Sequence, residues 1–319
     1  MVTTDPRPAS PRPAQLPLPR TLDDVPGWFW PLDQQLFGWL LKRQTATGLR
    51  GDLLELGSYL GRSAILLGRH LQPGEVFTIC DLFDSDAPDG DNAAEMTRSY
   101  RQTLTRAAFE HNYLAFHPAL PTIVQAPTSV LADGRIATSS CRFVHIDASH
   151  LYEHVALDIR TAGKVLAEHG IVVLDDFRSP HTPGVAAATW EAVFEHDLHP
   201  LCVTPEKLYG TWADPEPLQE ELLGLNGDAE NCYLDVDVIA GQRLVRFSGR
   251  GVAKLLPAGR PPRDRPPEAP PRLPEPARTE RRPRSAVQTT ARRLALDLLP
   301  PVATRAVRRH RQATRDRQG

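Results

Sequence analysis

Asp52-Leu53-Leu54-Glu55-Leu56-Gly57-Ser58-Tyr59-Leu60-Gly61-Arg62-Ser63 passes from an apolar strand through a glycine turn into a helical pattern. Such a turn leaves backbone N–H groups at a helix N-terminus uncovered by side chains, where they can bind an anionic or polar ligand. Gly57 permits the turn, and Gly61 permits close approach of the helix or of the ligand. The segment therefore predicts a ligand-binding loop between the first strand and its helix.

A second apolar run follows about twenty residues later and supports this prediction. Residues 76–80 form the run, and Asp81 ends it. An acid at this point can accept hydrogen bonds from both hydroxyls of a ribose. The two segments together predict a nucleoside-type cofactor site on a doubly wound α/β sheet.

The spacing of the glycines indicates which cofactor this is. A dinucleotide fingerprint is G-x-G-x-x-G, whereas Glu55-x-Gly57-x-x-x-Gly61 has one glycine fewer and an acid two residues before the first. A carboxylate there suits a cofactor with an amino group and a cationic sulfonium better than one with a pyrophosphate. The segment resembles motif I of the class I S-adenosylmethionine (SAM) dependent methyltransferases, although an ordinary strand–turn–helix stays open as an alternative. The predicted cofactor-binding residues of this segment are Glu55, Gly57, Ser58, Gly61 and Ser63.

Composition places the chain among globular proteins of a reducing compartment. It has 319 residues, of which 41% are hydrophobic, and no apolar run approaches the roughly 18 residues of a membrane span. The N-terminus lacks a basic region followed by an apolar one, so we expect no secretory signal. The four cysteines lie far apart without a C-x-x-C pair, which argues against a zinc site or a disulfide framework. We expect a cytoplasmic protein.

Charge is distributed unevenly along the chain. The net charge is −2, yet residues 250–319 carry about +12. We expect a disordered segment at 1–20, a methyltransferase domain at 21–250, a Pro/Arg-rich linker at 251–285 and a basic, helical tail at 286–319. The tail is a candidate for contact with an anionic membrane or another polyanion, and a solvated or docked tail is the alternative. We expect no nucleic-acid partner, and a homo-oligomer is compatible with the sequence.

Apolar runs and helical periodicity alternate in the order of a parallel sheet. We expect strands at 51–57, 75–81, 121–125, 141–147, 170–176 and 200–204, and helices at 32–44, 62–71, 93–112, 151–166 and 185–195. Residues 232–239 and 243–247 predict a closing antiparallel hairpin. The fold class is therefore α/β, a doubly wound Rossmann-like methyltransferase sheet, mostly parallel, with a C-terminal antiparallel hairpin. Before the first helix, Trp28 and Trp30 either fill gaps at a sheet edge or form an aromatic lid or dimer contact.

Acidic residues end several of the predicted strands. In open α/β sheets ligands bind outside the carboxyl ends of the strands, where Asp147, Asp175 and Asp176 stand. Adjacent like charges repel unless a positive charge lies between them, and three carboxylates suit Mg²⁺. Because neighbouring strand residues face opposite ways, only one of Asp175 and Asp176 could point inward. Asp147 could alternatively only cap the next helix.

A histidine follows the first of these acids by three residues. His150 lies on the turn into the next helix, over the same rim, and a neutral imidazole is a good general base near pH 7. A structural hydrogen bond is the alternative role. His145 competes for the catalytic role but lies mid-strand, packed in the sheet. After the third predicted strand, residues 128–131, which include Ser129, are expected beside an adenine ring.

Two longer runs allow the family to be named more closely. They are Arg142-Phe143-Val144-His145-Ile146-Asp147-Ala148-Ser149-His150-Leu151-Tyr152-Glu153-His154-Val155, with Asp158 after it, and Gly170-Ile171-Val172-Val173-Leu174-Asp175-Asp176-Phe177. They resemble the methyltransferases that include the macrocin and mycinamicin sugar O-methyltransferases, over roughly residues 50–195. The resemblance implies SAM contacts at Gly57, Ser63 and Asp81, magnesium ligands at Asp147, Asp175 and Asp176, and His150 as the base. Ala148 departs from the glycine usual in the family, and Asp175 from its frequent glutamate.

The sequence thus predicts a SAM-dependent O-methyltransferase that uses Mg²⁺, with His150 and Asp147 as catalytic residues. On resemblance, the acceptor is a hydroxyl of a sugar, a glycolipid or another natural product. Three alternatives stay open: a metal-independent SAM methyltransferase, an NAD-type oxidoreductase, and a non-enzymatic protein that binds a partner through the basic tail. The N-terminal tryptophan segment and the tail lie outside the resemblance.

Overall fold

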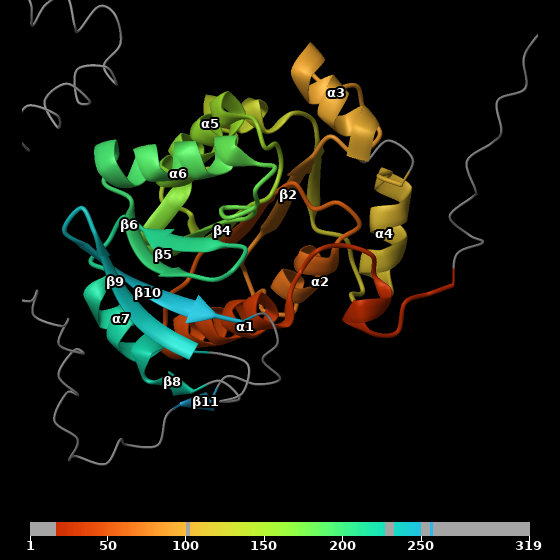
Figure 1. Cartoon of the computed structure of the whole chain (residues 1–319). Coiled ribbons are helices and arrows are strands. Elements are labelled where there is room, and N and C mark those ends of the chain that lie inside the picture. Colours follow the sequence, from red (N-terminus) through yellow and green to blue (C-terminus); the bar gives the residue numbers. More distant parts are fainter. Residues whose placement is uncertain (1–16, 100–102, 227–232, 250–255, 258–319) are drawn as a thin grey trace, which may run out of the picture. The chain divides into compact units, whose positions relative to one another are not determined.

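The computed structural model describes residues 17–99, 103–226, 233–249 and 256–257 (Figure 1). Most of segment 1–20, nearly all of the expected linker 251–285 and the whole of the basic tail 286–319 lie outside the described residues. Among those described, no helix combines the length and the apolar character needed to cross a bilayer. The strands are β1 (Asp52–Leu56), β2 (Phe77–Asp81), β3 (Thr122–Gln125), β4 (Cys141–Ile146), β5 (Leu166–Leu174), β6 (His199–Val203), β7 (Leu208–Thr211), β8 (Leu225–Asn226), β9 (Tyr233–Ile239), β10 (Gln242–Ser248) and β11 (Leu256–Pro257). The helices are η2 (Leu22–Asp24), α1 (Pro31–Ala46), α2 (Arg62–Gly68), α3 (Gly90–Ser99), α4 (Arg106–Leu114), η3 (Thr128–Asp133), α5 (Tyr152–Val165), α6 (Pro183–Glu195) and α7 (Glu216–Leu223).

A central sheet organises the described residues. Its strand order is β3-β2-β1-β4-β5-β7-β6-β10-β9. The strands from β3 to β5 in this order, β3-β2-β1-β4-β5, run parallel to one another. Strand β7 is antiparallel to both of its neighbours, and β9 and β10 form the expected antiparallel hairpin. Because β1 leads to β2 on one side while β4 pairs on the other, the switch point of the sheet lies between β1 and β4.

Helices cover both faces of this sheet, as a doubly wound fold requires (Figure 1). One apolar cluster packs α1, α2, α4 and α7 against one face, and a second packs η3, α5 and α6 against the other. Strand β4 is buried along its whole length, which fits a strand covered on both faces. The predicted fold class is therefore confirmed.

Several predicted boundaries were wrong. The expected helix 93–112 is two helices, α3 and α4, and β5 begins earlier than expected. Strand β7 and helix α7 were not predicted at all. Strand β7 has only four residues, one of them Gly210, so its apolar run is too short to be recognised without its neighbours in the sheet.

Helix α1 lies on the sheet rather than only at its edge. Its residues Leu32, Leu36 and Leu40 are fully buried, as their spacing predicts. The Phe37 ring packs edge-on against Phe143 of β4, at 5.0 Å between ring centroids. The helix therefore brings the tryptophan segment before it to the carboxyl ends of the central strands.

Candidate active site

A cavity of about 600 Å³ lies at the carboxyl ends of β1, β2, β4 and β5. This volume is typical of a small-molecule site. The predicted site residues that line it are Gly57, Ser58, Ser63, Asp81, Ser129, Asp147, His150, Asp175 and Asp176. The predicted residues Glu55 and Gly61 are not among the lining residues. Most of the residues chosen from the sequence thus meet in one place.

Gly57 brings the loops after β1 and β4 into direct contact. Its φ is +77°, and a Cβ there would lie 2.0 Å from the backbone oxygen of Asp147. Only glycine fits such a position, because any side chain would push the two loops apart. The loop that follows β1 therefore presents bare backbone at the switch point.

Asp81 is bound to that loop from the end of β2. Its Oδ2 accepts hydrogen bonds from the backbone N–H of Ser58 at 2.7 Å and of Tyr59 at 3.1 Å. Its Oδ1 accepts one from the N–H of Phe83 at 2.6 Å. Burial raises the pKa of Asp81, and these donors oppose the rise. The carboxylate is thus held in a defined orientation on the cavity wall.

Glu55 and Gly61 have structural positions beside the cavity. Glu55 is fully buried, and its Oε1 lies 2.8 Å from Nδ1 of His145. Burial raises the pKa of Glu55 to about 8. Gly61 has a φ of +94° before the first turn of α2, and a Cβ there would meet the Phe109 ring at 3.0 Å. Gly61 therefore permits close packing of protein side chains.

Two serines reach the cavity from short helices on either side. Ser63 lies in the first turn of α2 and is largely buried, and Ser129 lies in η3, directly after β3. Their hydroxyl groups can donate and accept hydrogen bonds. Together with Asp81 they add polar groups to the cavity wall.

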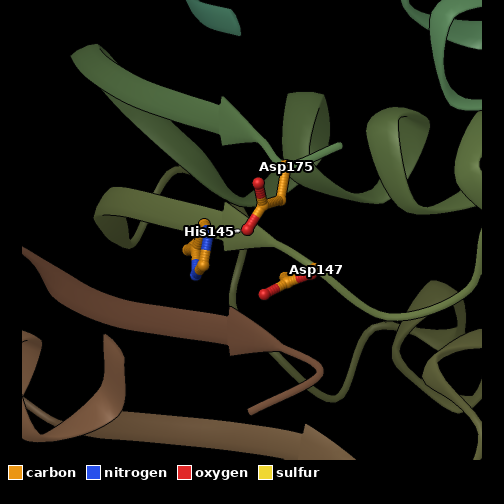
Figure 2. A group of neighbouring side chains, drawn as sticks. All are labelled: His145, Asp147 and Asp175. Carbon is orange, nitrogen blue, oxygen red and sulfur yellow. Dashed lines mark ion pairs between the residues drawn. The ribbon is translucent and has the colours of Figure 1, made fainter. Parts of the chain in front are cut away.

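Two of the three predicted magnesium ligands lie together with a histidine in one group. Asp147 and Asp175 come together with His145, and one ligand atom from each lies within 4.8 Å of the others (Figure 2). Nε2 of His145 is 3.9 Å from Oδ2 of Asp175. Asp176 turns elsewhere: its Oδ2 lies 2.9 Å from Nε2 of His150, and its Oδ1 accepts a hydrogen bond from Ser179. The two adjacent acids thus have different partners.

Lys207, which was not singled out in the sequence, provides the charge beside this group. It lies in the turn before β7, its side chain is 1% exposed, and its Nζ donates a hydrogen bond to Oδ2 of Asp175. The same Nζ lies 3.5 Å from Nε2 of His145 and 5.6 Å from the centre of the Phe29 ring. The sequence shows only a lysine at the start of an apolar run. Because an exposed strand end gives the same pattern, the sequence did not indicate that Lys207 is buried in the site.

Electrostatics in this group follow from burial and from the lysine. Burial, reinforced by the charge of Lys207, lowers the pKa of His145 to about 3, so its ring is neutral at pH 7. Burial and the charge of Asp175 raise the pKa of Asp147. Burial disfavours the charged form of Lys207, but Asp175 and Asp147 outweigh it and raise the pKa of the ammonium. The lysine therefore stays charged in its buried position.

His150 and Asp176 form a second, separate pair on the cavity wall. Burial raises the pKa of Asp176, but hydrogen bonds from His150 and Ser179 outweigh it and lower the pKa to about 2. Asp176 is therefore ionised at neutral pH, and its Oδ2 accepts a hydrogen bond from Nε2–H of His150. A carboxylate in this position orients an imidazole and stabilises its protonated form.

The N-terminal segment forms the outer wall of the cavity. Trp28 and Trp30 line it and are 65% and 36% exposed, which disfavours the interpretation that they fill gaps at a sheet edge. The Trp28 and Tyr59 rings lie 5.5 Å apart between centroids. The segment thus presents an aromatic surface to the cavity.

The two cofactors implied by the sequence fit these residues to different degrees. Bare backbone at Gly57, the oriented carboxylate of Asp81 and a cavity of about 600 Å³ fit a nucleoside cofactor such as SAM. Magnesium prefers several oxygen ligands in an octahedron. The group found here contains an imidazole nitrogen and borders a buried ammonium, and Asp176 is absent from it. The residues therefore do not fit the predicted magnesium site.

Three solved structures are similar to part of this chain. The structure of the O-methyltransferase NovP shares 16% identity, with a TM-score of 0.47 over 57% of this chain and 79% of that one. The calicheamicin-biosynthesis enzyme CalS11, a TDP-rhamnose 3′-O-methyltransferase, shares 19% identity, with a TM-score of 0.39 over 57% and 80%. An O-methyltransferase from Bacillus cereus in complex with SAH shares 13% identity, with a TM-score of 0.39 over 62% and 93%.

Sequence comparison gives a family for the central part of the chain. No curated protein sequence matches the chain. Residues 54–177 match the family model described as a methyltransferase domain. This range runs from β1 to the end of β5 and contains the glycine loop, Asp81 and the strand-end acids. Residues 54–177 are therefore similar to a methyltransferase domain.

Proposed function

We propose that the chain is an O-methyltransferase that transfers the methyl group of SAM to a hydroxyl of a sugar or another natural product. The single observation that carries this proposal is that the His150–Asp176 pair lies on the same cavity as the glycine loop and Asp81. A base and a nucleoside site within one cavity are what hydroxyl methylation requires.

Five residues would hold the cofactor. Backbone at Gly57 and Ser58, the carboxylate of Asp81 and the hydroxyls of Ser63 and Ser129 line the cavity together. When bound there, SAM supplies a sulfonium-activated methyl group. The contribution of the protein is then mainly to align the acceptor oxygen with that methyl group.

His150 would act as the general base. Bound SAM would supply the methyl group to the acceptor oxygen and leave as SAH, and His150 would take up the proton of the acceptor hydroxyl. Nε2 of His150 lies 2.9 Å from Oδ2 of Asp176, and this carboxylate would orient the imidazole for proton transfer. Asp176 would then stabilise the resulting imidazolium, and Asp147 would line the rim beside it.

The aromatic wall favours an acceptor with a flat or ring-shaped apolar face. Trp28, Trp30 and Tyr59 line the outer cavity, where sugar rings or aromatic rings can stack on them. Charged acceptors that require a basic pocket fit this wall less well. This supports a sugar or aromatic natural product as the acceptor class.

A magnesium-dependent transfer, as predicted from the sequence, is the alternative form of this proposal. Asp147 and Asp175 still lie with His145 in a group that could hold a cation, which keeps the alternative testable. The ammonium of Lys207 beside Asp175 argues against it. The proposed transfer is therefore written without a metal.

Replacement of His150 tests the proposal. We expect His150→Ala to lower the rate of SAH release roughly 10²–10⁴-fold across a panel of sugar and phenolic acceptors, because general-base catalysis contributes that much. SAM affinity measured by calorimetry should stay unchanged. Asp81→Ala should instead weaken SAM binding.

His154→Gln is the matched control, because His154 also lines the cavity but contacts Ser149 and Asp89 rather than Asp176. It should retain most of the activity. Full activity of His150→Ala, with His154→Gln inactive, would show that the base is misassigned. Failure of the wild type to bind SAM would overturn the proposed function itself.

A further inference from the structure

Lys207 lies beside Asp175, one of the acids that the sequence predicted to bind a metal. The turn between β6 and β7 fixes it: the N–H of Lys207 donates to Oγ1 of Thr204 at 2.9 Å, and the N–H of Thr204 donates to its carbonyl at 2.9 Å. The side chain runs inward beside the Phe29 ring and is buried. Its ammonium is therefore a built part of the site.

The ammonium uses the oxygen that a metal ion would need. Nζ of Lys207 donates to Oδ2 of Asp175, and that same oxygen faces Nε2 of His145 at 3.9 Å. A divalent cation bound to Asp175 would stand next to a buried positive charge. At such separations in a protein interior, like charges repel strongly.

His145 is also committed within the group. An ammonium has only donors, so at 3.5 Å from Nζ of Lys207, Nε2 of His145 faces it as an acceptor. Its Nδ1 then carries the proton and donates to Oε1 of Glu55 at 2.8 Å. Both ring nitrogens thus belong to a chain from Asp175 through Lys207 and His145 to Glu55.

Charge balance around the lysine completes the argument. Asp33, whose Oδ1 accepts a hydrogen bond from Tyr209, contributes with Asp147 and Asp175 to the negative field at Lys207. The buried ammonium thus supplies these three acids with a positive charge. From the sequence, a metal ion was expected to supply that charge. The neighbouring acid Asp176 has His150 as its own partner.

We propose that the ammonium of Lys207 takes the place of a divalent cation, so that this methyltransferase holds its strand-end acids and transfers methyl groups without a metal. Lys207 is a positioning residue, which acts through Asp175 and Asp147. Only the part of the inference that concerns methyl transfer rests on the proposed function. Metal binding at Asp147 and Asp175 can be measured without an acceptor.

Manganese binding to the full-length protein tests the proposal directly. Electron paramagnetic resonance would follow Mn²⁺ uptake by the wild type and by Asp175→Asn, each with and without SAM. We expect the two proteins to bind equally, because any Mn²⁺ taken up by exposed acids does not depend on Asp175. One equivalent bound by the wild type and lost in Asp175→Asn would overturn the proposal.

Removal of the ammonium should create the missing site. Lys207→Met keeps much of the side-chain volume, and we expect it to gain Mn²⁺ binding of at least tenfold higher affinity than the wild type. Lys207→Arg, which keeps the charge, should gain none. The gain should disappear in the double variant Lys207→Met/Asp175→Asn.

Folding of each variant is checked by SAM titration and thermal melting. A folded Lys207→Met that gains no Mn²⁺ would contradict the proposal. If this variant does not fold, the comparison of wild type with Asp175→Asn decides alone.

Methyl transfer by the wild type should be unchanged by EDTA. Loss of transfer that Mg²⁺ restores would contradict the inference, whereas absence of transfer with or without Mg²⁺ would count against the proposed function.

Discussion

At the scale of single residues, the two adjacent acids Asp175 and Asp176 have different hydrogen-bond partners. Asp175 continues the β5 pairing, with its N–H donating to the carbonyl of Ile146 at 3.0 Å, and its side chain faces Lys207. Asp176 has a φ of +55°, which ends the strand and turns its side chain to His150. The change of backbone conformation between them therefore separates two functions.

Asp158 provides a pH-dependent test at the same scale. It is buried in α5, and burial raises its pKa to about 7. Since its ordinary pKa is 3.8, the folded protein binds a proton between about pH 4 and pH 7 that the unfolded chain has released. The contribution of protonated Asp158 to the free energy of unfolding is therefore fully present below about pH 4 and is lost as the pH rises through 7.

We expect Asp158→Asn to remove this loss. An asparagine resembles the protonated acid, so the free energy of unfolding of the variant relative to the wild type should rise by up to about 4 kcal/mol between pH 4 and pH 8. Urea unfolding at both pH values measures it. An equal difference between the two proteins at both pH values would contradict the assignment.

At the scale of elements, Arg62 of α2 ties the N-terminal segment to the cavity. Its guanidinium donates to the backbone carbonyls of Leu22, Asp23, Val25 and Gly27 at 2.7 to 3.1 Å. Only the fork of donors on an arginine can bind several carbonyls in this way. One side chain thus holds the segment that carries Trp28 and Trp30.

Arg62→Gln should release that segment without disturbing the cofactor side. Loss of hydrogen bonds from a charged donor costs about 1.5–3 kcal/mol each. We therefore expect amide exchange of residues 22–29 to quicken at least tenfold and the KM for an acceptor to rise, with SAM affinity within about threefold. Arg69→Gln, at an exposed arginine of the same region beside Phe116, is the control and should change neither.

At the scale of the whole molecule, both apolar clusters are built from residues between Val25 and Phe247. A chain that ends at Pro261 retains all of these residues and corresponds to one compact unit. We expect this shortened chain to melt within a few degrees of the full-length protein and to bind SAM equally well. A large loss of stability would show that residues 262–319 contribute to the fold. Contact of the basic tail with a membrane or another polyanion stays a prediction.

Much of the fold could be predicted because its signals are local. The runs that became β1, β2, β4 and β5 are apolar and stop at a glycine or an aspartate, and the turn of the β9–β10 hairpin lies between two adjacent strands in the sequence. Strand β7 could not be predicted in the same way. Its four residues are stabilised by pairing with β5 and β6, and neither partner is recognisable from the strand itself.

Several residues of the predicted site line one cavity, but the sequence did not predict which side chains contact one another. Gly57, Asp81, Asp147 and His150 meet at the cavity as expected. Two adjacent acids indicated a metal because the sequence shows charges without their partners. Glu55 was expected to bind the cofactor, and in the structure it contacts His145.

The order of residues along the chain was enough to determine the glycine loop, the acids at the strand ends and the position of His150. Each depends on neighbours within a few residues, whose spacing is covalent. Tertiary structure alone decided which charge stands beside Asp175. Lys207 lies 32 residues from it and 62 from His145, and β7 brings them together only after the sheet has formed. A buried charge is stable only where distant parts of the chain supply its counter-charges.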